Sequence, residues 1–295
     1  MVDHVAERGG GARRAPLQES LALARAVGEP WLIGHALYHA LLRVANSAAV
    51  GRAGERAYAR AAGEEGIRLL RAAGDTMAGA RARFSLGQVA LYEGDYERAR
   101  AAFVDCLPML RAQRSQSFLA DGLVSLADVA RGQGDYGEAT ALYAEGLALY
   151  RAPEDRWLPA VAGVLSRLAA FAFERGEWAV AQAHLAQSLT IARDTGHVGA
   201  PVRAPELAGV FEVGAALAAV QGAPGRAVRL AGVAAAQRAH LKRPATAAEQ
   251  ATLEGRLTSA RQVLSAAEHA AAWAEGQAMT PEQAIDYALE EPPPA

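Results

Sequence analysis

Two histidines four residues apart, His35 and His39, have the spacing of paired metal ligands on a helix. In zinc peptidases the H-E-x-x-H pattern places both imidazoles on one helix face and supplies a glutamate as the general base. Here Ala36, Leu37 and Tyr38 stand between the histidines, so that base is missing, and no third ligand is evident. We therefore interpret the pair as half-buried or as part of a pocket wall, and we predict no metal site.

The other residues with reactive side chains also lack a catalytic setting. Cys106 is the only cysteine, so no disulfide can form within the chain, and a reducing compartment is expected. The only lysine, Lys242, is followed by Arg243, which excludes a phosphate-binding G-x-x-x-x-G-K-[ST] loop. No G-x-S-x-G nucleophile elbow occurs. We predict neither catalytic residues nor a cofactor, and we expect that the protein is not an enzyme.

Composition points to a large helical protein. The chain has 295 residues, 52% of them hydrophobic but only 6% aromatic, so alanine supplies much of the apolar surface. Alanine favours helices and lets their axes approach closely. The net charge is -2, with arginines and carboxylates interspersed, which argues against a basic face for nucleic acid. Because no apolar run is long enough for a signal or a membrane span, we expect a cytoplasmic protein that does not bind membranes.

A repeated pattern of glycine, acidic residue, aromatic residue and alanine organises the chain. Its repeat glycines lie 40, 42 and 46 residues apart. A leucine follows the first three glycines after 13 residues, and counting back 40 residues from the first reaches Gly54, with Ala59 and Ile67 in the matching places. The four copies are Gly94-Asp95-Tyr96-x-x-Ala99, Gly134-Asp135-Tyr136-x-x-Ala139, Gly176-Glu177-Trp178-x-x-Ala181 and the weaker Gly222-Ala223-Pro224-x-x-Ala227.

Each position of this pattern predicts a part of a helical hairpin. Apolar residues at helical spacing precede each glycine, and the glycine supplies the left-handed turn that ends this first helix. The acidic residue caps or charges the start of the second helix. The aromatic residue packs at the turn, and the alanine lets the two helices sit close together. Cys106 aligns with Gly146 and Ser188 at a small position of the second helix, which predicts a buried, unreactive thiol.

The pattern, with Leu86-Gly87 and Leu126-Ala127 upstream of the turn, resembles the tetratricopeptide repeat, although the period here is longer than the usual 34 residues. The long units and the tail, Arg229–Ala236 and Ala271–Ile285, are similar to the C-terminal halves of large bacterial ATP-binding transcriptional regulators of the LuxR type. That resemblance implies a sensor or scaffold segment. The ATP-binding domain and the DNA-binding helix-turn-helix of those regulators have no counterpart here, so the chain is interpreted as a segment of a longer protein or a stand-alone relative.

We therefore predict an all-α fold, a right-handed superhelical solenoid of about five long tetratricopeptide-like hairpins with a C-terminal helical cap. Residues 1–15 are predicted to be a disordered tail, residues 16–243 the repeat array, and residues 244–295 the capping helices with a proline-rich end. The array begins with a lone helix, Pro16–Val27. Two closing helices are expected, Ala248–Glu275 and Pro281–Glu290, the second starting at Thr280.

In such an array the first helix of each hairpin lines the inner wall, and its positions that do not serve the core are free for recognition. Counting back from each repeat glycine gives a set that mixes charged with aromatic side chains, which suits a peptide, a protein segment or a polar small ligand. An ordinary solvated helix face is the alternative. The predicted binding residues are Arg81, Phe84, Gln88, Asp121, Asp128, Arg131, Ser166, Phe173 and Glu212, with Val124, Ala170 and Ala216 between them.

The sequence thus favours a non-catalytic binding module for a protein or peptide partner, with a small ligand as a further option and no direct binding of nucleic acid. We expect it to belong to a bacterial signalling or transcription regulator. The alternative is an architectural scaffold that forms a homodimer through an uncovered terminal face near Leu17, Leu21 and Leu23. An enzyme built on helical hairpins is disfavoured, because no convergent set of titratable groups is evident.

Overall fold

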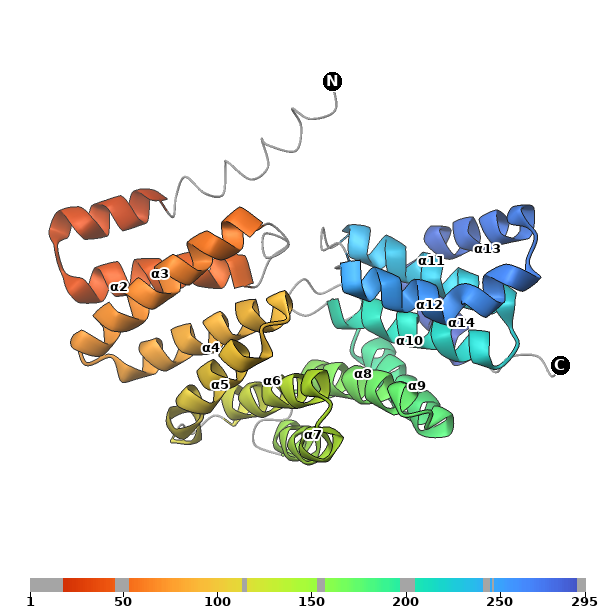
Figure 1. The fold of residues 1–295 in the computed structure, drawn as a ribbon, viewed down its shortest axis with the longest axis horizontal. Coiled ribbons are helices and arrows are strands. Elements are labelled where there is room, and N and C mark those ends of the chain that lie inside the picture. The colour runs from red at the N-terminus through yellow and green to blue at the C-terminus, as the bar shows by residue number, and fades with distance from the viewer. Residues whose placement is uncertain are drawn as a thin grey trace, which may run out of the picture. The chain divides into compact units, whose positions relative to one another are not determined.

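A computed structural model describes residues 18–45, 53–112, 116–152, 157–196, 205–240, 245 and 247–290. Every regular element in these ranges is an α-helix, and successive helices pair as antiparallel hairpins (Figure 1). The chain divides into two compact units, Met1–Gly146 and Leu147–Ala295. The predicted tail at residues 1–15, positions 244 and 246 of the predicted loop at residues 244–247, and the proline-rich end lie outside the described residues, and Ala247 already belongs to a helix.

The first unit begins with a helix over residues 18–27 and continues with three hairpins. The second hairpin packs on the first through contacts of α4 with both α2 and α3, and α6 packs on α4 and α5. Buried side chains such as Leu41, Val44, Ile67 and Val89 form the core between the first two hairpins. The helices of this unit are α2 (Pro30–Ala45), α3 (Ala53–Ala72), α4 (Thr76–Glu93), α5 (Tyr96–Arg111), α6 (Ser117–Gln133) and α7 (Tyr136–Arg151), whose last residues belong to the second unit.

The second unit contains two further hairpins and a helical cap. Phe211, Leu189, Leu230 and Ile285 lie in one continuous core that joins the hairpins to the cap. The cap helices contact the hairpins individually, with α12 on α10 and α11, α13 on α11, and α14 on α9 and α11. The elements are α8 (Leu158–Glu174), α9 (Trp178–Thr195), α10 (Pro205–Val220), α11 (Pro224–His240), α12 (Ala247–Val263), α13 (Ala266–Ala278) and α14 (Pro281–Leu289).

The hairpin turns follow the predicted roles of the glycine and the acidic residue. Each repeat glycine of the four copies has a positive φ, between 74° at Gly94 and 82° at Gly134. Asp95 and Asp135 each accept a hydrogen bond from a backbone N–H in the first turn of the following helix. Glu177 stands at the same position but makes no capping hydrogen bond through its side chain. Gly54, counted back from the first copy, lies inside α3 and not at a turn.

Small residues mark the place where the two helices of a hairpin come closest. Ala99, Ala139 and Ala181 are completely buried, as the repeat pattern predicts. A side chain at Gly146 would place its Cβ 2.7 Å from Val124 Cγ2, and Ser188 donates a hydrogen bond across its hairpin to the carbonyl of Ala162 at 2.8 Å. The 40-residue period therefore reflects one repeated helix crossing that only small side chains fit.

A polar link also recurs between consecutive hairpins. Counted from Gly54, Gly94 and Gly176, the residue six positions after the glycine contacts the residue immediately before the next repeat glycine. The pairs are Arg60 with Glu93 at 2.6 and 2.7 Å, Arg100 with Gln133 at 3.0 Å, and Gln182 with Gln221 at 2.9 Å. The same positions thus join neighbouring hairpins with different chemistry.

The described residues confirm the prediction of an all-α array of about five tetratricopeptide-like hairpins with a C-terminal helical cap. The prediction of two closing helices is wrong, because three are present. Residues 248–275 were expected to form one helix, but α12 ends at Val263, and Ser265 begins α13 through a capping box with Glu268. The predicted helix start at Thr280 is confirmed by a second capping box with Gln283.

Candidate functional site

The predicted binding residues of the first unit lie along α4 and α6, but several turn toward neighbouring helices. Arg81 lies half-buried with its guanidinium carbon 4.5 Å from the centroid of the Phe118 ring. The ring of Phe84 packs on that of the buried Phe103, with centroids 5.4 Å apart. Gln88, Asp121 and Arg131 are half-buried.

Asp128 differs from the expected outward orientation. Its side chain is buried, and it accepts a short hydrogen bond from the hydroxyl of Tyr143, which is itself completely buried. A buried carboxylate needs such a partner, because leaving it without one in an apolar environment is costly. This pair joins the two helices of the third hairpin, so Asp128 has a packing role in the structure.

The three predicted residues of the second unit also have neighbours within that unit. Ser166 is buried on α8. Phe173 packs edge-on against Trp178 at 5.5 Å between ring centroids, and the Arg256 guanidinium lies 4.9 Å from its ring centroid. Glu212 accepts two hydrogen bonds from the guanidinium of Arg238, at 2.6 and 3.1 Å.

His35 and His39 lie on one face of α2 with ring centroids 6.4 Å apart. His35 Nε2 lies 3.0 Å from Oδ2 of Asp75, the residue that caps α4, and Trp31 Nε1 donates to the same oxygen at 3.1 Å. Within the described ranges, no group of three or more His, Cys, Asp or Glu side chains could hold a metal ion. His35 therefore joins α2 to the start of α4, whereas the ring contacts of His39 are with residues of α2 itself.

Cys106 has the buried environment that the repeat register predicts. It is only 1% exposed, and its Sγ donates a hydrogen bond to the carbonyl of Phe103 at 3.1 Å. Burial raises the pKa of the Cys106 thiol to about 12. Since the thiolate is the reactive form, this side chain is not an activated nucleophile.

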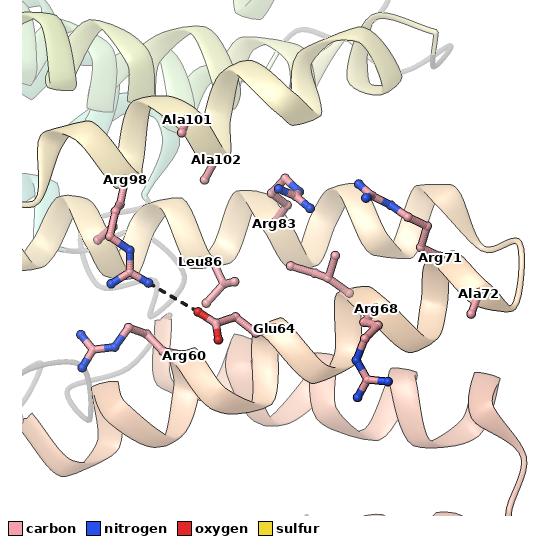
Figure 2. Close-up of a pocket in the computed structure, with 12 residues that line it drawn as sticks. Arg60, Glu64, Arg68, Arg71, Ala72, Arg83, Leu86, Arg98, Ala101 and Ala102 are labelled. Atoms are coloured by element: carbon pink, nitrogen blue, oxygen red, sulfur yellow. Dashed lines mark ion pairs between the residues drawn. The ribbon is translucent and has the colours of Figure 1, made fainter.

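Two second helices of the first unit, α3 and α5, and the first helix α4 form a pocket that the sequence analysis did not identify. It has a volume of about 640 Å³ and lies among α3, α4 and α5 (Figure 2). The α3 residues on its wall follow helical spacing, so they share one face of that helix. Short alanine side chains of α3 and α5 leave open space between the long arginines. Its lining is Arg60, Glu64, Ile67, Arg68, Arg71, Ala72, Arg83, Leu86, Ala90, Arg98, Ala101 and Ala102.

Positive charge predominates in this arginine pocket, whose described lining includes five arginines and one glutamate. Arg60 is paired with Glu93, and Arg83 Nη1 lies 2.8 Å from the exposed Asp105 carboxylate. Other pairs are long, because Arg98 approaches Glu64 only to 3.5 Å. Glu93, Asp105 and Glu64 thus each accompany one of these arginines, and the excess positive charge of the pocket rests on Arg68 and Arg71.

Two arginines of the pocket, Arg68 and Arg71, make no ion pair or hydrogen bond through their side chains with any described residue. In Figure 2 the guanidinium groups of Arg71 and Arg83 point toward one another, one from the end of α3 and the other from α4. The apolar side chains of Ile67 and Leu86 lie on the same wall. This arrangement can bind a carboxylate or another anion with bidentate hydrogen bonds.

A second pocket, of about 570 Å³, lies in the second unit among α10, α11, α12 and α13. Alanines of α11, Leu253, Leu257 and Trp273 give it an apolar wall. Glu212 and Arg238 also line it, but their charges are paired with one another. Of the nine predicted binding residues, Glu212 lines this pocket, and none lines the arginine pocket.

The arginine pocket was missed because the sequence analysis searched only the first helix of each hairpin. Arg60, Glu64, Arg68 and Arg71 stand at helical spacing in the sequence, which could have indicated one charged face on the second helix. The contribution of Arg83 and Arg98 depends on how the hairpins pack, and the sequence alone does not show it.

Comparison with known families supports the repeat type. Residues 123–156 match the family model described as tetratricopeptide repeat. Repeats of this type generally mediate interactions between proteins or act as scaffolds. The comparison with curated proteins finds no match.

Among solved structures, the chain is similar to BtubC (BKLC) from P. vanneervenii. The TM-score is 0.58 and the sequence identity 16%, and the match covers 79% of this chain and 92% of that one. At this identity the similarity supports the fold only. None of the helices that the structure describes is both long and apolar enough to cross a membrane.

Proposed function

We propose that this chain is a non-catalytic binding module for a protein partner, acting as the sensor or scaffold part of a bacterial signalling or transcription regulator in the cytoplasm. Residues 123–156, within the third hairpin and the segment after it, match a repeat type that generally binds proteins. The resemblance of its long units and its tail to the LuxR-type regulators supports the regulatory setting.

The observation that carries the proposal is the excess of positive charge in the arginine pocket. Arg68 and Arg71 are exposed on α3 and have no carboxylate partner among the described residues, so their charges are available to a binding partner. Unpaired arginines beside apolar surface are typical of sites where a partner supplies the missing charge. The first-helix residues, including Arg81 and Asp121, remain a second candidate surface for the same partner.

The test is to capture partners of the tagged chain from its source organism, purify the captured proteins, and measure binding of each to the purified chain by calorimetry. We expect at least one purified protein to bind with defined stoichiometry. If none binds directly, the proposal that this chain is a protein-binding module is wrong. Reversing charge at Arg68 and Arg71, and separately at Arg81 and Asp121, then shows which surface is used.

Self-association is the second candidate function, and exposed apolar side chains near the start of the first unit favour it. Leu23 and Val27 are 62% and 63% exposed, and the adjacent Trp31 is 47% exposed. Sedimentation over a wide range of concentrations would reveal a dimer, and replacing Leu23 and Val27 by glutamate should abolish it. A monomer at every concentration would eliminate this candidate.

A further inference from the structure

The arginine pocket carries an inference about the chemistry of the partner. Arg71 and Arg83 point toward one another, and Arg71 has no carboxylate partner in the described part of the chain (Figure 2). Arg83 already contacts the exposed Asp105 carboxylate at 2.8 Å, so the uncompensated charge is that of Arg71, and an anion between the two guanidinium groups gains an attractive contact with each. The geometry therefore favours a ligand with a negative group at this end of the pocket.

The rest of the lining indicates that this ligand is more than a single ion. The half-buried Leu86, with the small exposed parts of Ile67 and Ala90, adds apolar surface to the wall, which suits an aliphatic side chain of the ligand. Arg60 and Arg98, with Glu64, stand at the other end of the view in Figure 2, so positive side chains occur on both sides of the apolar surface. A volume of about 640 Å³ is in the range of sites for small ligands or a few side chains.

Nucleic acid fits this lining less well than a peptide does. Proteins that bind single strands use aromatic side chains to stack the bases along an extended basic groove. None of the described residues that line the pocket is aromatic. An acidic peptide instead combines carboxylates for the arginines with an aliphatic side chain for the apolar wall.

We propose that the arginine pocket binds a short acidic segment of the partner protein, with one aspartate or glutamate carboxylate held between Arg71 and Arg83 and an aliphatic side chain packed on Ile67 and Leu86. This inference rests on the proposed function and specifies its partner. Arg68 contributes to the attraction of the segment as an unpaired charge at the edge of the site.

The experiment uses the full chain and a fluorescein-labelled peptide, Glu-Glu-Leu-Glu-Glu, with its Gln-Gln-Leu-Gln-Gln counterpart as the neutral probe. Binding is followed by fluorescence anisotropy at low and high salt. The wild type should bind the acidic probe at least about tenfold more tightly than the neutral one, with an affinity that falls as salt screens the charges.

The matched variants are R68E/R71E and R111E/R151E, which change the net charge equally. Arg111 and Arg151 are exposed and do not line the pocket. R68E/R71E should weaken acidic-probe binding at least about tenfold, because two attractive charges become repulsive, whereas R111E/R151E should change it less than about threefold. Circular dichroism of both variants checks that the helices are intact.

Several outcomes would overturn the inference. Equal binding by R68E/R71E and wild type would place the peptide elsewhere, and equal binding of the two probes would show that carboxylates are not recognised. Tighter binding of a phosphoserine-containing peptide or of a single-stranded oligonucleotide, again lost in R68E/R71E, would assign the pocket to that ligand instead. If a purified partner binds but no acidic peptide does, this inference fails while the proposed function stands.

Discussion

Oδ2 of Asp75 lies 3.0 Å from Nε2 of His35, which connects the cap of α4 to α2 of the preceding hairpin. Oδ2 also accepts a hydrogen bond from the indole N–H of Trp31. The other carboxylate oxygen, Oδ1, accepts a hydrogen bond from the backbone N–H of Ala78. Asp75 therefore caps the first helix of the second hairpin and also bonds that hairpin to the first one.

Replacing Asp75 by alanine should lower the free energy of unfolding by about 1–2 kcal/mol, because a cap and two side-chain contacts are lost. Asp95→Ala is the matched control, since Asp95 also caps a helix but makes no hydrogen bond or ion pair with the preceding hairpin in the described structure. Urea denaturation of both variants measures the difference. An equal loss in the two would mean that the contacts to α2 contribute nothing.

The stabilisation of the fold by the Asp75 carboxylate should depend on pH. The backbone N–H of Ala78 and the His35 side chain hold the pKa of the Asp75 carboxyl below its usual range. A lowered pKa means that the folded state favours the ionised carboxylate. The stabilisation is therefore complete above the unfolded pKa, about 4, and is lost as pH falls through the folded pKa. Urea curves of wild type and Asp75→Ala should converge at acidic pH.

Gly276→Ala should loosen the cap of the second unit. A Cβ at Gly276 would stand 2.0 Å from the carbonyl oxygen of Arg229, so α13 must move away from α11. We expect a loss of about 1–3 kcal/mol and faster proteolysis of α13. Gly255→Ala is the control, because Gly255 lies in α12 with no atom within 4 Å of the added Cβ. That variant should gain about 0.5–1 kcal/mol, and a gain at Gly276 would contradict the close packing.

His184 should make the second unit less stable as the solution becomes mildly acidic. Burial, with a smaller contribution from the nearby charge of Arg151, lowers the pKa of the His184 imidazole in the folded protein. The unfolded chain then takes up a proton first, so stability falls as pH drops below about 6.5. Chemical denaturation at neutral and mildly acidic pH should show a smaller decrease in His184→Gln than in the wild type. Substituting the exposed His240 in the same way should leave the decrease unchanged.

Cys106 should resist thiol reagents in the folded protein. Its thiol is buried and its pKa is raised to about 12, so almost no thiolate is present at mildly alkaline pH. A chromogenic disulfide reagent should react only after denaturant is added, with one thiol released per chain. Rapid reaction of the native protein would show that α5 opens readily.

The fold was predictable from the sequence at positions where the backbone or the packing requires a particular small residue. Gly94, Gly134 and Gly176 end helices in the left-handed conformation, and Ala99 and its equivalents are completely buried, as expected for small residues between closely packed helices. The helix break at Ser265 was missed because the residues around it are rich in alanine and favour a continuous helix. Ser265 and Glu268 nevertheless have the sequence pattern of a capping box. The long run on both sides of Ser265 has high helix propensity, and the local cap decided where it breaks.

The candidate site was less predictable, because it depends on contacts between helices. Counting along α6 placed Asp128 on an outward face, but its burial is compensated by the hydroxyl of Tyr143 in the next helix. Arg71 and Arg83 meet only because α3 and α4 pack together. No spacing within a single helix indicates which of its polar residues will find such partners.

The recurring link between hairpins has a different chemical character at each place. Between Arg60 and Glu93 it is ionic, whereas between Gln182 and Gln221 it is a neutral amide contact. Dissolved salt screens the first and leaves the second unchanged. Added salt should therefore weaken the polar contact between the first two hairpins and leave that between the fourth and fifth hairpins as it is.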